Sequence, residues 1–470
     1  MPDASAGIAH AVGCGMDTAQ PDVLVPPRPL MPERELPLLQ FLRAVRTNAL
    51  TIWPEKAYRE DVLTRRFLGR TNMLVNAPDV IHRVLVDNHA NYRRSPASIR
   101  ILRPITGNGL LLSDGEEWRH QRRTIAPSLA PRTLPLLARH IVASTEQALT
   151  ALEAQSAAPL DLLAAMQNLA LDIAGRSMFS LEVRQYGAAM RRLLNEYGLN
   201  YARPHLFDML LPPSIPTLRD LGRRRFQRRW MALIAEIVRT RLAAPEADTP
   251  RDLFDLLRAA RDPETGAGFS QDQLRDQTAT MILAGHETTA VALFWSLVLL
   301  AGSPGEQQCV ADEVRGVAIA PDTAMAAMPG LPRTRAVISE TLRLYPPAFT
   351  IVREAIAADR AGDVEIPRGA VLMVAPWVLH RHHRLWRDPD RFDPSRFLPD
   401  APAPPRFAYL PFGAGPRVCV GAQFALTEAT LVLAMLLQRF AVTLEGPAPM
   451  PVAVVTTQPD HPPAFRLHPR

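Results

Sequence analysis

Lysine is almost absent from this chain. Lys56 is the only lysine among 53 basic residues, so the formal net charge of +6 rests on arginine. A phosphate-binding loop needs a Gly-Lys-Ser/Thr sequence, and Lys56 stands between Glu55 and Ala57, which excludes such a loop. The arginines are spread along the chain without a basic tail, which argues against nucleic acid as a partner.

Cysteine is also scarce. Cys14, Cys309 and Cys419 form an odd, sparse set that does not fit a disulfide framework and favours a reducing, cytoplasmic location. Residues 1–50 contain no long apolar stretch, so the sequence predicts no signal peptide and no N-terminal membrane anchor. With 47% hydrophobic residues, the chain can still build a large core.

The distribution of proline and of helical spacing divides the chain. Residues 1–35 are rich in proline and are predicted to form an irregular arm, followed by a single domain over 36–470. From about 116 to 345, leucine and alanine recur at the spacing of helices. Residues 346–411 contain many prolines and only short strand-like runs.

One predicted helix is unusually long. Ser270 and Gln273 form a capping box that starts it, and Gly302 stops it. Its apolar second half has the length of a membrane span. His286 and Glu287 would be costly in lipid, so we predict a buried helix that crosses a large domain.

Residues 412–421 read FGAGPRVCVG and carry the strongest functional signal. The glycines allow tight turns beside a flat ligand. Cys419 directly precedes an apolar helix, whose N–H groups and dipole are expected to favour a thiolate, the form of cysteine that binds metals. Arg417 is suited to pair with a carboxylate.

This segment resembles the haem-binding signature of the cytochrome P450 family. A chance match at all fixed positions is expected on the order of 10⁻⁶ times per chain. The resemblance implies that haem b (iron protoporphyrin IX) is the cofactor and that Cys419 is the ligand of its iron. The fixed positions, all present, are Phe412, Gly413, Gly415, Arg417, Cys419 and Gly421, and all of them except Gly415 are implied to bind the cofactor.

Residues 284–289, AGHETT, lie in the long predicted helix and resemble the family's oxygen-activation motif. Small Ala284 leaves room for the cofactor and the substrate. Thr288 and Glu287 are the implied catalytic residues, which deliver protons. The alternative for Thr288 is a hydrogen bond to its own helix. A zinc site of the HExxH type is excluded because Ala290 stands where the second histidine is needed.

Residues 340–343, ETLR, resemble the family's Glu-x-x-Arg motif, although such a pair is often only a surface contact. The resemblance implies that Glu340 and Arg343 are structural and pair with an arginine downstream. Arg391 and Arg396 are both candidates, and the preceding Phe-Asp favours Arg396.

Further cofactor and substrate contacts follow from the resemblance. Trp118 and Arg122 share one helix face and can both donate to a haem propionate. Arg353 is implied to be another propionate partner. The implied substrate-pocket residues are Ala284, Thr288, Ala348, Phe349 and Thr350.

The resemblance covers about residues 60–440 and implies a mainly α fold, a cytochrome P450-like single large helical domain with small β-sheets near 60–85, 350–375 and 440–470. The chain is similar to soluble, bacterial-type members of the family. The implied activity is a haem-dependent monooxygenase that inserts one atom of O2 into a hydrophobic organic substrate, by hydroxylation or epoxidation. The sequence does not distinguish fatty acids, terpenes, steroids and aromatics as substrates. The alternative functions are a peroxygenase or isomerase, and a haem sensor or carrier.

The electrons are expected to come from a separate protein. No G-x-G-x-x-G sequence for a flavin or nicotinamide module is found. By family analogy the partner is a soluble ferredoxin with its reductase, or else a flavodoxin. Arg119, Arg123 and Arg406 are predicted to form a positive docking face near the cysteine segment.

Overall fold

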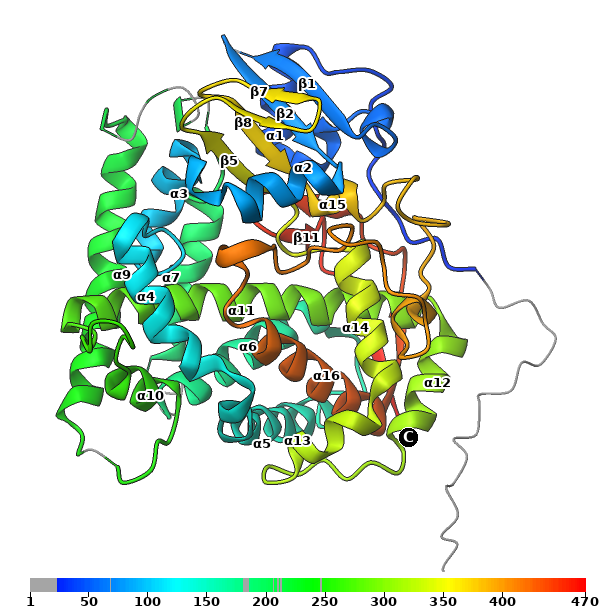
Figure 1. Ribbon diagram of the computed structural model, residues 1–470. Coiled ribbons are helices and arrows are strands. Elements are labelled where there is room, and N and C mark those ends of the chain that lie inside the picture. The colour runs from blue at the N-terminus through cyan, green and yellow to red at the C-terminus, as the bar shows by residue number, and fades with distance from the viewer. Residues whose placement is uncertain are drawn as a thin grey trace, which may run out of the picture.

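Helices make up most of the molecule, and a five-stranded sheet lies on one side of the helical part, at the top of Figure 1. The predicted mainly α fold with small sheets is confirmed. The computed structural model describes residues 23–67, 69–180, 186–205, 207–208, 211, 214–245 and 247–470.

The helices surround one long central helix, α11, which crosses the middle of the molecule (Figure 1). The helices are α1 Leu38–Thr47, α2 Pro78–His82, α3 Pro96–Thr106, α4 Gly115–Ile125, α5 Leu134–Glu153, α6 Leu162–Phe179, α7 Gly187–Asn200, α9 Leu218–Ala243, α10 Leu253–Ala259, α11 Gln271–Ala301, α12 Pro304–Val314, α13 Ala324–Ala327, α14 Pro332–Leu344, α15 Pro376–Leu379 and α16 Ala422–Arg439.

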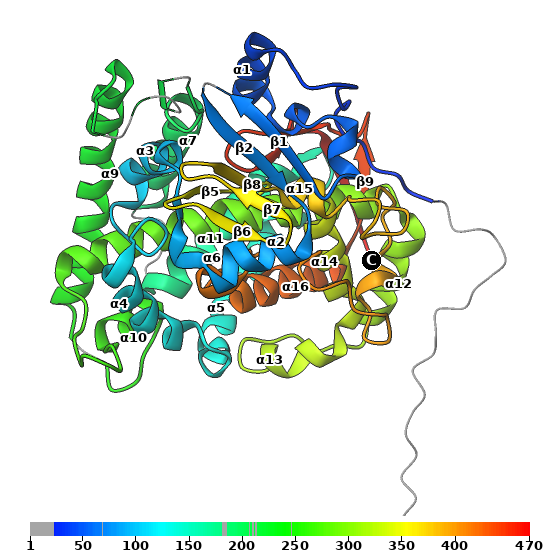
Figure 2. The ribbon, with the colours of Figure 1, turned by 45° about the horizontal axis from the view of Figure 1, so that its top comes forward.

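The strands form one larger sheet, with the order β1-β2-β8-β5-β3, and three small ones, β4-β12-β9, β6-β7 and β10-β11. In Figure 2 the molecule is turned so that the larger sheet comes toward the viewer. Strands occur in all three regions predicted to hold them. The strands are β1 Val62–Phe67, β2 Arg70–Val75, β3 Tyr92–Arg94, β4 Leu160–Asp161, β5 Ile351–Ala355, β6 Asp359–Ala361, β7 Val364–Ile366, β8 Val371–Val374, β9 Phe440–Glu445, β10 Pro451–Ala453, β11 Thr457–Pro459 and β12 Ala464–Pro469.

The central helix has the predicted bounds and the predicted environment. Both bonds of the capping box between Ser270 and Gln273 are present, and α11 ends before Gly302. By length and composition it could cross a membrane, but 72% of its most apolar window is buried inside the protein. It packs against α6, α9, α14 and α16, so its hydrophobic surface is covered by the chain itself.

The proline-rich arm lies against the body of the protein where it is described. Residues 23–37 contain no helix or strand, and the earlier part of the predicted arm, with Cys14, lies outside the described residues. The Tyr345 hydroxyl donates to the carbonyl of Pro27 at 2.9 Å, and Arg28 lies 3.1 Å from Asp390. The main core cluster includes residues from 49 to 467.

Candidate active site

A large, mainly apolar cavity of about 1440 Å³ lies beside α11 and extends to residues of α1 and β1. Segments far apart in the sequence meet in it, including α4, α7, the end of α14 and the segment before α16. Every residue predicted to bind the cofactor, the substrate or protons lines this cavity: Trp118, Arg122, Ala284, Glu287, Thr288, Ala348, Phe349, Thr350, Arg353, Phe412, Gly413, Arg417, Cys419 and Gly421.

Backbone contacts determine the shape of the cysteine loop, residues 412–421. The N–H of Cys419 donates to the carbonyl of Phe412 at 2.9 Å and closes the loop. Gly413 and Gly415 have φ values of +73° and +72°, which other residues rarely adopt. A Cβ at Gly415 would also overlap the carbonyl oxygen of Leu85, so glycine is required there for two reasons.

Burial of the Cys419 sulfur opposes the predicted effect of the helix terminus on its thiol. The side chain can be reached from the cavity, but protein atoms surround the sulfur, and this burial raises the pKa of the thiol. The N–H of Gly421 and the guanidinium of Arg122 oppose the rise without overcoming it. A metal cation at the sulfur would reverse the balance, because a coordinating thiol is deprotonated.

Partly buried arginines gather at the sheet side of the cavity. Arg94 on β3 stands directly opposite Arg353 on β5, and both line the cavity. Burial and the neighbouring Arg353 and Arg417 lower the pKa of Arg94 to about 9. Burial and Arg417 lower the pKa of Arg353 to about 10. Like charges directly opposite each other destabilise a sheet, so this pair needs an anion.

The sequence analysis did not identify Arg94. No motif contains it, and its position depends on the pairing of β3 with a strand far along the chain. Arg417 lies over the ring of Trp118 at 4.4 Å and pairs with Asp114, which is more than half exposed. Arg122 donates to the carbonyl of Val418 at 2.8 Å. Cationic side chains thus outnumber carboxylates here. The site therefore fits a ligand that carries carboxylates, such as haem b with its two propionates.

Replacing Arg94 with leucine should weaken haem binding and stabilise the haem-free protein. Loss of one charge-assisted contact is expected to speed haem dissociation about tenfold. The haem-free variant should gain at least about 1 kcal/mol of stability, because a partly buried, repelled charge is removed. Haem transfer to apomyoglobin and thermal unfolding of the haem-free protein at pH 7 measure the two effects.

A neighbouring arginine on the same strand tests whether the effect is specific to Arg94. Arg93→Leu is the matched control, because Arg93 pairs with Glu354 at 2.7 Å and is half exposed. Equal haem dissociation in both variants would contradict the assignment.

The central helix brings Thr288 and Glu287 to the cavity. The Thr288 hydroxyl donates to the carbonyl of Ala284 at 2.6 Å, so the alternative raised by the sequence is present in the structure. This bond uses the proton of the hydroxyl and leaves its oxygen as an acceptor at the cavity wall. The carboxylate of Glu287 accepts hydrogen bonds from Thr456 and Gln458, which the sequence analysis did not identify.

The remaining pocket residues come from the segment between α14 and β5. Ala348 is exposed to the cavity, Phe349 packs edge-on against Trp53 at 6.4 Å, and Thr350 lines the wall. His286 also lines the cavity, and burial lowers its pKa to about 4. Its ring is therefore neutral near pH 7 and adds no charge to the cavity wall.

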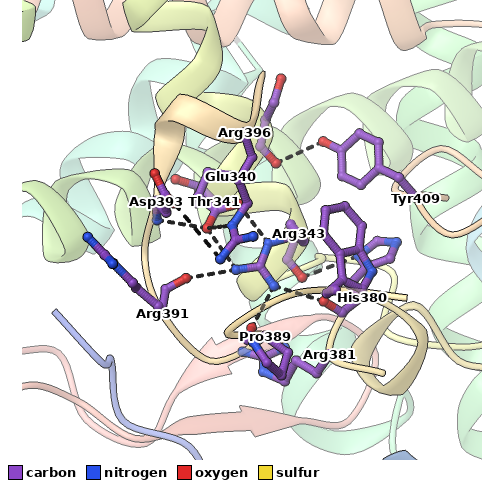
Figure 3. Close-up of polar contacts among 12 residues, drawn as sticks. Glu340, Thr341, Arg343, His380, Arg381, Pro389, Arg391, Asp393, Arg396 and Tyr409 are labelled. Carbon is purple, nitrogen blue, oxygen red and sulfur yellow. Dashed lines mark hydrogen bonds and ion pairs between the residues drawn. The ribbon is translucent and has the colours of Figure 1, made fainter. Parts of the chain in front are cut away.

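Glu340 and Arg343 lie outside the cavity, in a buried network (Figure 3). Two hydrogen bonds of 2.7 Å join them, and neither side chain has any exposed surface, so this is not a surface pair. Arg343 also donates to the carbonyls of His380, Pro389 and Arg391. The network therefore joins α14 to the segment that leads to the cysteine loop.

The two candidates for the third member of this network have different roles. The guanidinium of Arg396 lies 3.7 Å from the carboxylate of Glu340. Arg391 contributes its backbone carbonyl, which accepts from Arg343 at 2.9 Å. Figure 3 shows Arg396 on the same side as Glu340, while the Arg391 side chain points away. The backbone N–H of Asp393 supplies a further bond to Glu340, at 2.9 Å.

A mainly α fold, a cysteine loop on a large cavity and partly buried arginines that need carboxylates are together the features of a haem-binding oxidoreductase. The comparisons agree: the family model "Cytochrome P450" matches residues 35–461. The chain belongs to the cytochrome P450 family. It is a monooxygenase that binds haem b and acts on an organic substrate with O2 and a redox partner.

Its named relatives include proteins of both plants and streptomycetes. Cyclooctatin synthase of Streptomyces melanosporofaciens is 32% identical over 81% of this chain and 82% of its own length. Pentalenene oxygenase of Streptomyces avermitilis is 32% identical over 85% of this chain and 88% of its own. Among solved structures, the haem domain of cytochrome P450DA superposes with a TM-score of 0.79 at 25% identity, covering 95% of this chain and 98% of that one.

Proposed function

We propose that this enzyme hydroxylates or epoxidises a large apolar molecule of the terpenoid class. The observation that carries the proposal is the large, mainly apolar cavity that Cys419 and Thr288 both line. Apolar walls with few polar groups bind hydrocarbon-like ligands. The names of the relatives, pentalenene oxygenase and cyclooctatin synthase, support this substrate class.

The residues that would hold the cofactor follow from the cavity wall. Cys419 would hold the haem iron through its sulfur, and the haem, when bound, would supply the activation of O2. The proposed propionate partners are Trp118, Arg122, Arg353 and Arg417, together with Arg94. Ala284, Phe412, Gly413 and Gly421 line the wall where a flat ring is expected, with mostly small side chains.

Thr288 and Glu287 are the proposed proton-delivery pair. Because the Thr288 proton is engaged with Ala284, the hydroxyl oxygen can accept a hydrogen bond from a water or a reacting group in the cavity. The neighbouring carboxylate of Glu287 can take up a proton and release it. The pair thus connects the cavity with a titratable group on the same helix.

Replacing Thr288 with alanine should leave haem and substrate binding intact but uncouple turnover. Reductant consumption is expected to continue while hydrogen peroxide replaces most of the product. The coupling, which is the product formed per reductant consumed, should fall by about tenfold or more. Product, peroxide and oxidised reductant are measured in the same reaction. Thr289→Ala is the control, since Thr289 is buried next to it in α11. Unchanged coupling in Thr288→Ala would remove this residue from the mechanism.

A soluble ferredoxin with its reductase is the proposed electron donor, with a flavodoxin as the alternative. One part of the predicted docking face is wrong: Arg123 makes two 3.0 Å hydrogen bonds to the fully buried Asp262 and is not available to a partner. Arg119 pairs with Glu116, and Arg406 is exposed near the cysteine loop. We place the docking face around Arg406. A cytoplasmic location is part of the same proposal.

A screen for spin-state shifts tests the proposed function. Terpenoids, fatty acids, steroids and aromatics are added to the ferric protein, and each compound that shifts the spectrum is then tested for turnover. We expect terpenoids to shift the spectrum and to be oxygenated only with reductant, O2 and donor proteins. Turnover with hydrogen peroxide alone would favour a peroxygenase, and a protein that shifts with no compound would favour a haem sensor or carrier.

A further inference from the structure

The C-terminal hairpin β10–β11 holds the carboxylate of Glu287 by two hydrogen bonds. The Thr456 hydroxyl donates to Oε1 at 2.7 Å, and the Gln458 amide donates to the same oxygen at 2.9 Å. The Gln458 amide also lies 3.0 Å from the Thr456 hydroxyl, so the three side chains form a closed triangle. Among the described residues, none donates a hydrogen bond to Oε2 of Glu287.

The hairpin is itself well anchored. The indole of Trp295, on α11, donates to the carbonyl of Thr457 at 2.7 Å. The Thr457 hydroxyl donates to the carbonyl of Pro346 at 2.7 Å, and Thr457 is fully buried. At the other end, the Asn48 side chain bonds to the backbone of Pro451 and Ala453. A rigid element therefore presents Thr456 and Gln458 to Glu287.

A glutamate side chain has several rotatable bonds, and a carboxylate without partners would sample many orientations. Two bonds to one oxygen select one of them and leave the other oxygen to exchange protons. Preorganisation of this kind decides whether a catalytic group acts at the right place. Thr456 and Gln458 also line the cavity, as does the neighbouring Val455.

We propose that Thr456 and Gln458 are positioning residues that orient Glu287 for proton delivery. The inference rests on the proposed role of Glu287. It assigns the coupling of reductant use to product formation to a hairpin that follows α16, far in sequence from the oxygen-activation motif. Neither residue reacts; each acts through the carboxylate it holds.

The test is a double-mutant cycle. Thr456→Val and Gln458→Leu are made in the wild-type and in the Glu287→Ala background, with Thr456→Ser as the conservative variant. Each single variant should lower the product formed per reductant severalfold, while haem content and the substrate Kd from spin-state titration stay unchanged. Thr456→Ser should restore coupling, and neither change should lower coupling further in the Glu287→Ala background. Thr443→Val, an exposed threonine of β9, is the matched control.

A measurement without turnover accompanies it. Glu287→Ala should raise amide hydrogen exchange in residues 451–459 by about tenfold, because the hairpin loses two bonds to a charged group. Unchanged coupling in Thr456→Val and Gln458→Leu, or an equal loss in the Glu287→Ala background, would overturn the inference while leaving Glu287 in its proposed role. Full coupling in Glu287→Ala itself would overturn that role, and the inference with it.

Discussion

Cys419→Ala is expected to abolish the red-shifted Soret band of the reduced carbonyl complex, and with it monooxygenase turnover. The band requires a thiolate ligand, and Cys419 is the only cysteine on the cavity wall among the described residues. Alanine has no donor atom, so haem could be held only by its propionates and by apolar contacts. Absorption spectra of the dithionite-reduced, carbon monoxide-treated variant are the measurement.

Cys309→Ala is the control for this experiment. Cys309 lies on α12, away from the cavity, so its loss should leave the band in place. A Cys419→Ala variant that retains the red-shifted band would show that another cysteine binds the iron, and Cys309 or Cys14 would then have to be tested in the same way. A variant without bound haem would not answer the question, so haem content is measured first by pyridine haemochrome.

Glu340→Ala and Arg343→Ala should both give little folded holoprotein. Breaking a buried ion pair costs roughly 3–5 kcal/mol, a large part of the 5–15 kcal/mol that stabilises a typical protein. Burial raises the pKa of Glu340, and Arg343 is the main group that opposes this rise. Without Arg343, the carboxylate and the carbonyls of His380 and Pro389 lose their common donor. The yield of haem-containing protein and thermal unfolding measure the effect.

The pair of Asp312 and Arg315, at the C-terminal end of α12, provides the matched control. It has the same i, i+3 spacing and a distance of 2.7 Å, but both side chains are about half exposed or more. Arg315→Ala should therefore change stability by less than about 1 kcal/mol. If Arg343→Ala were as stable as Arg315→Ala and bound haem normally, the buried network would not support the cysteine loop.

Local sequence signals were sufficient to predict the central helix α11, the helix α16 and the cysteine loop. The capping box and Gly302 correctly predicted the two ends of α11, because capping depends on residues within one turn of the helix end. The glycines of the cysteine loop are needed for backbone conformations that a sequence pattern records directly. Contiguous motifs of this kind identify the family and the cavity wall without knowledge of the packing.

Pairings between distant segments could not be predicted in this way. Arg94 faces Arg353 only because β3 pairs with β5, and Thr456 holds Glu287 only because the C-terminal hairpin packs on α11. Arg123 looked available for docking because its sequence neighbours do not reveal Asp262.

The protonation of Cys419 also depends partly on its sequence neighbours and partly on tertiary packing. The sequence determined that this cysteine precedes a helix, because that depends on its immediate neighbours. Tertiary packing determined that burial raises the pKa of the thiol more than the N–H of Gly421 and the charge of Arg122 lower it. Desolvation depends on every atom that surrounds the sulfur, and most of those atoms belong to segments that only the fold brings together.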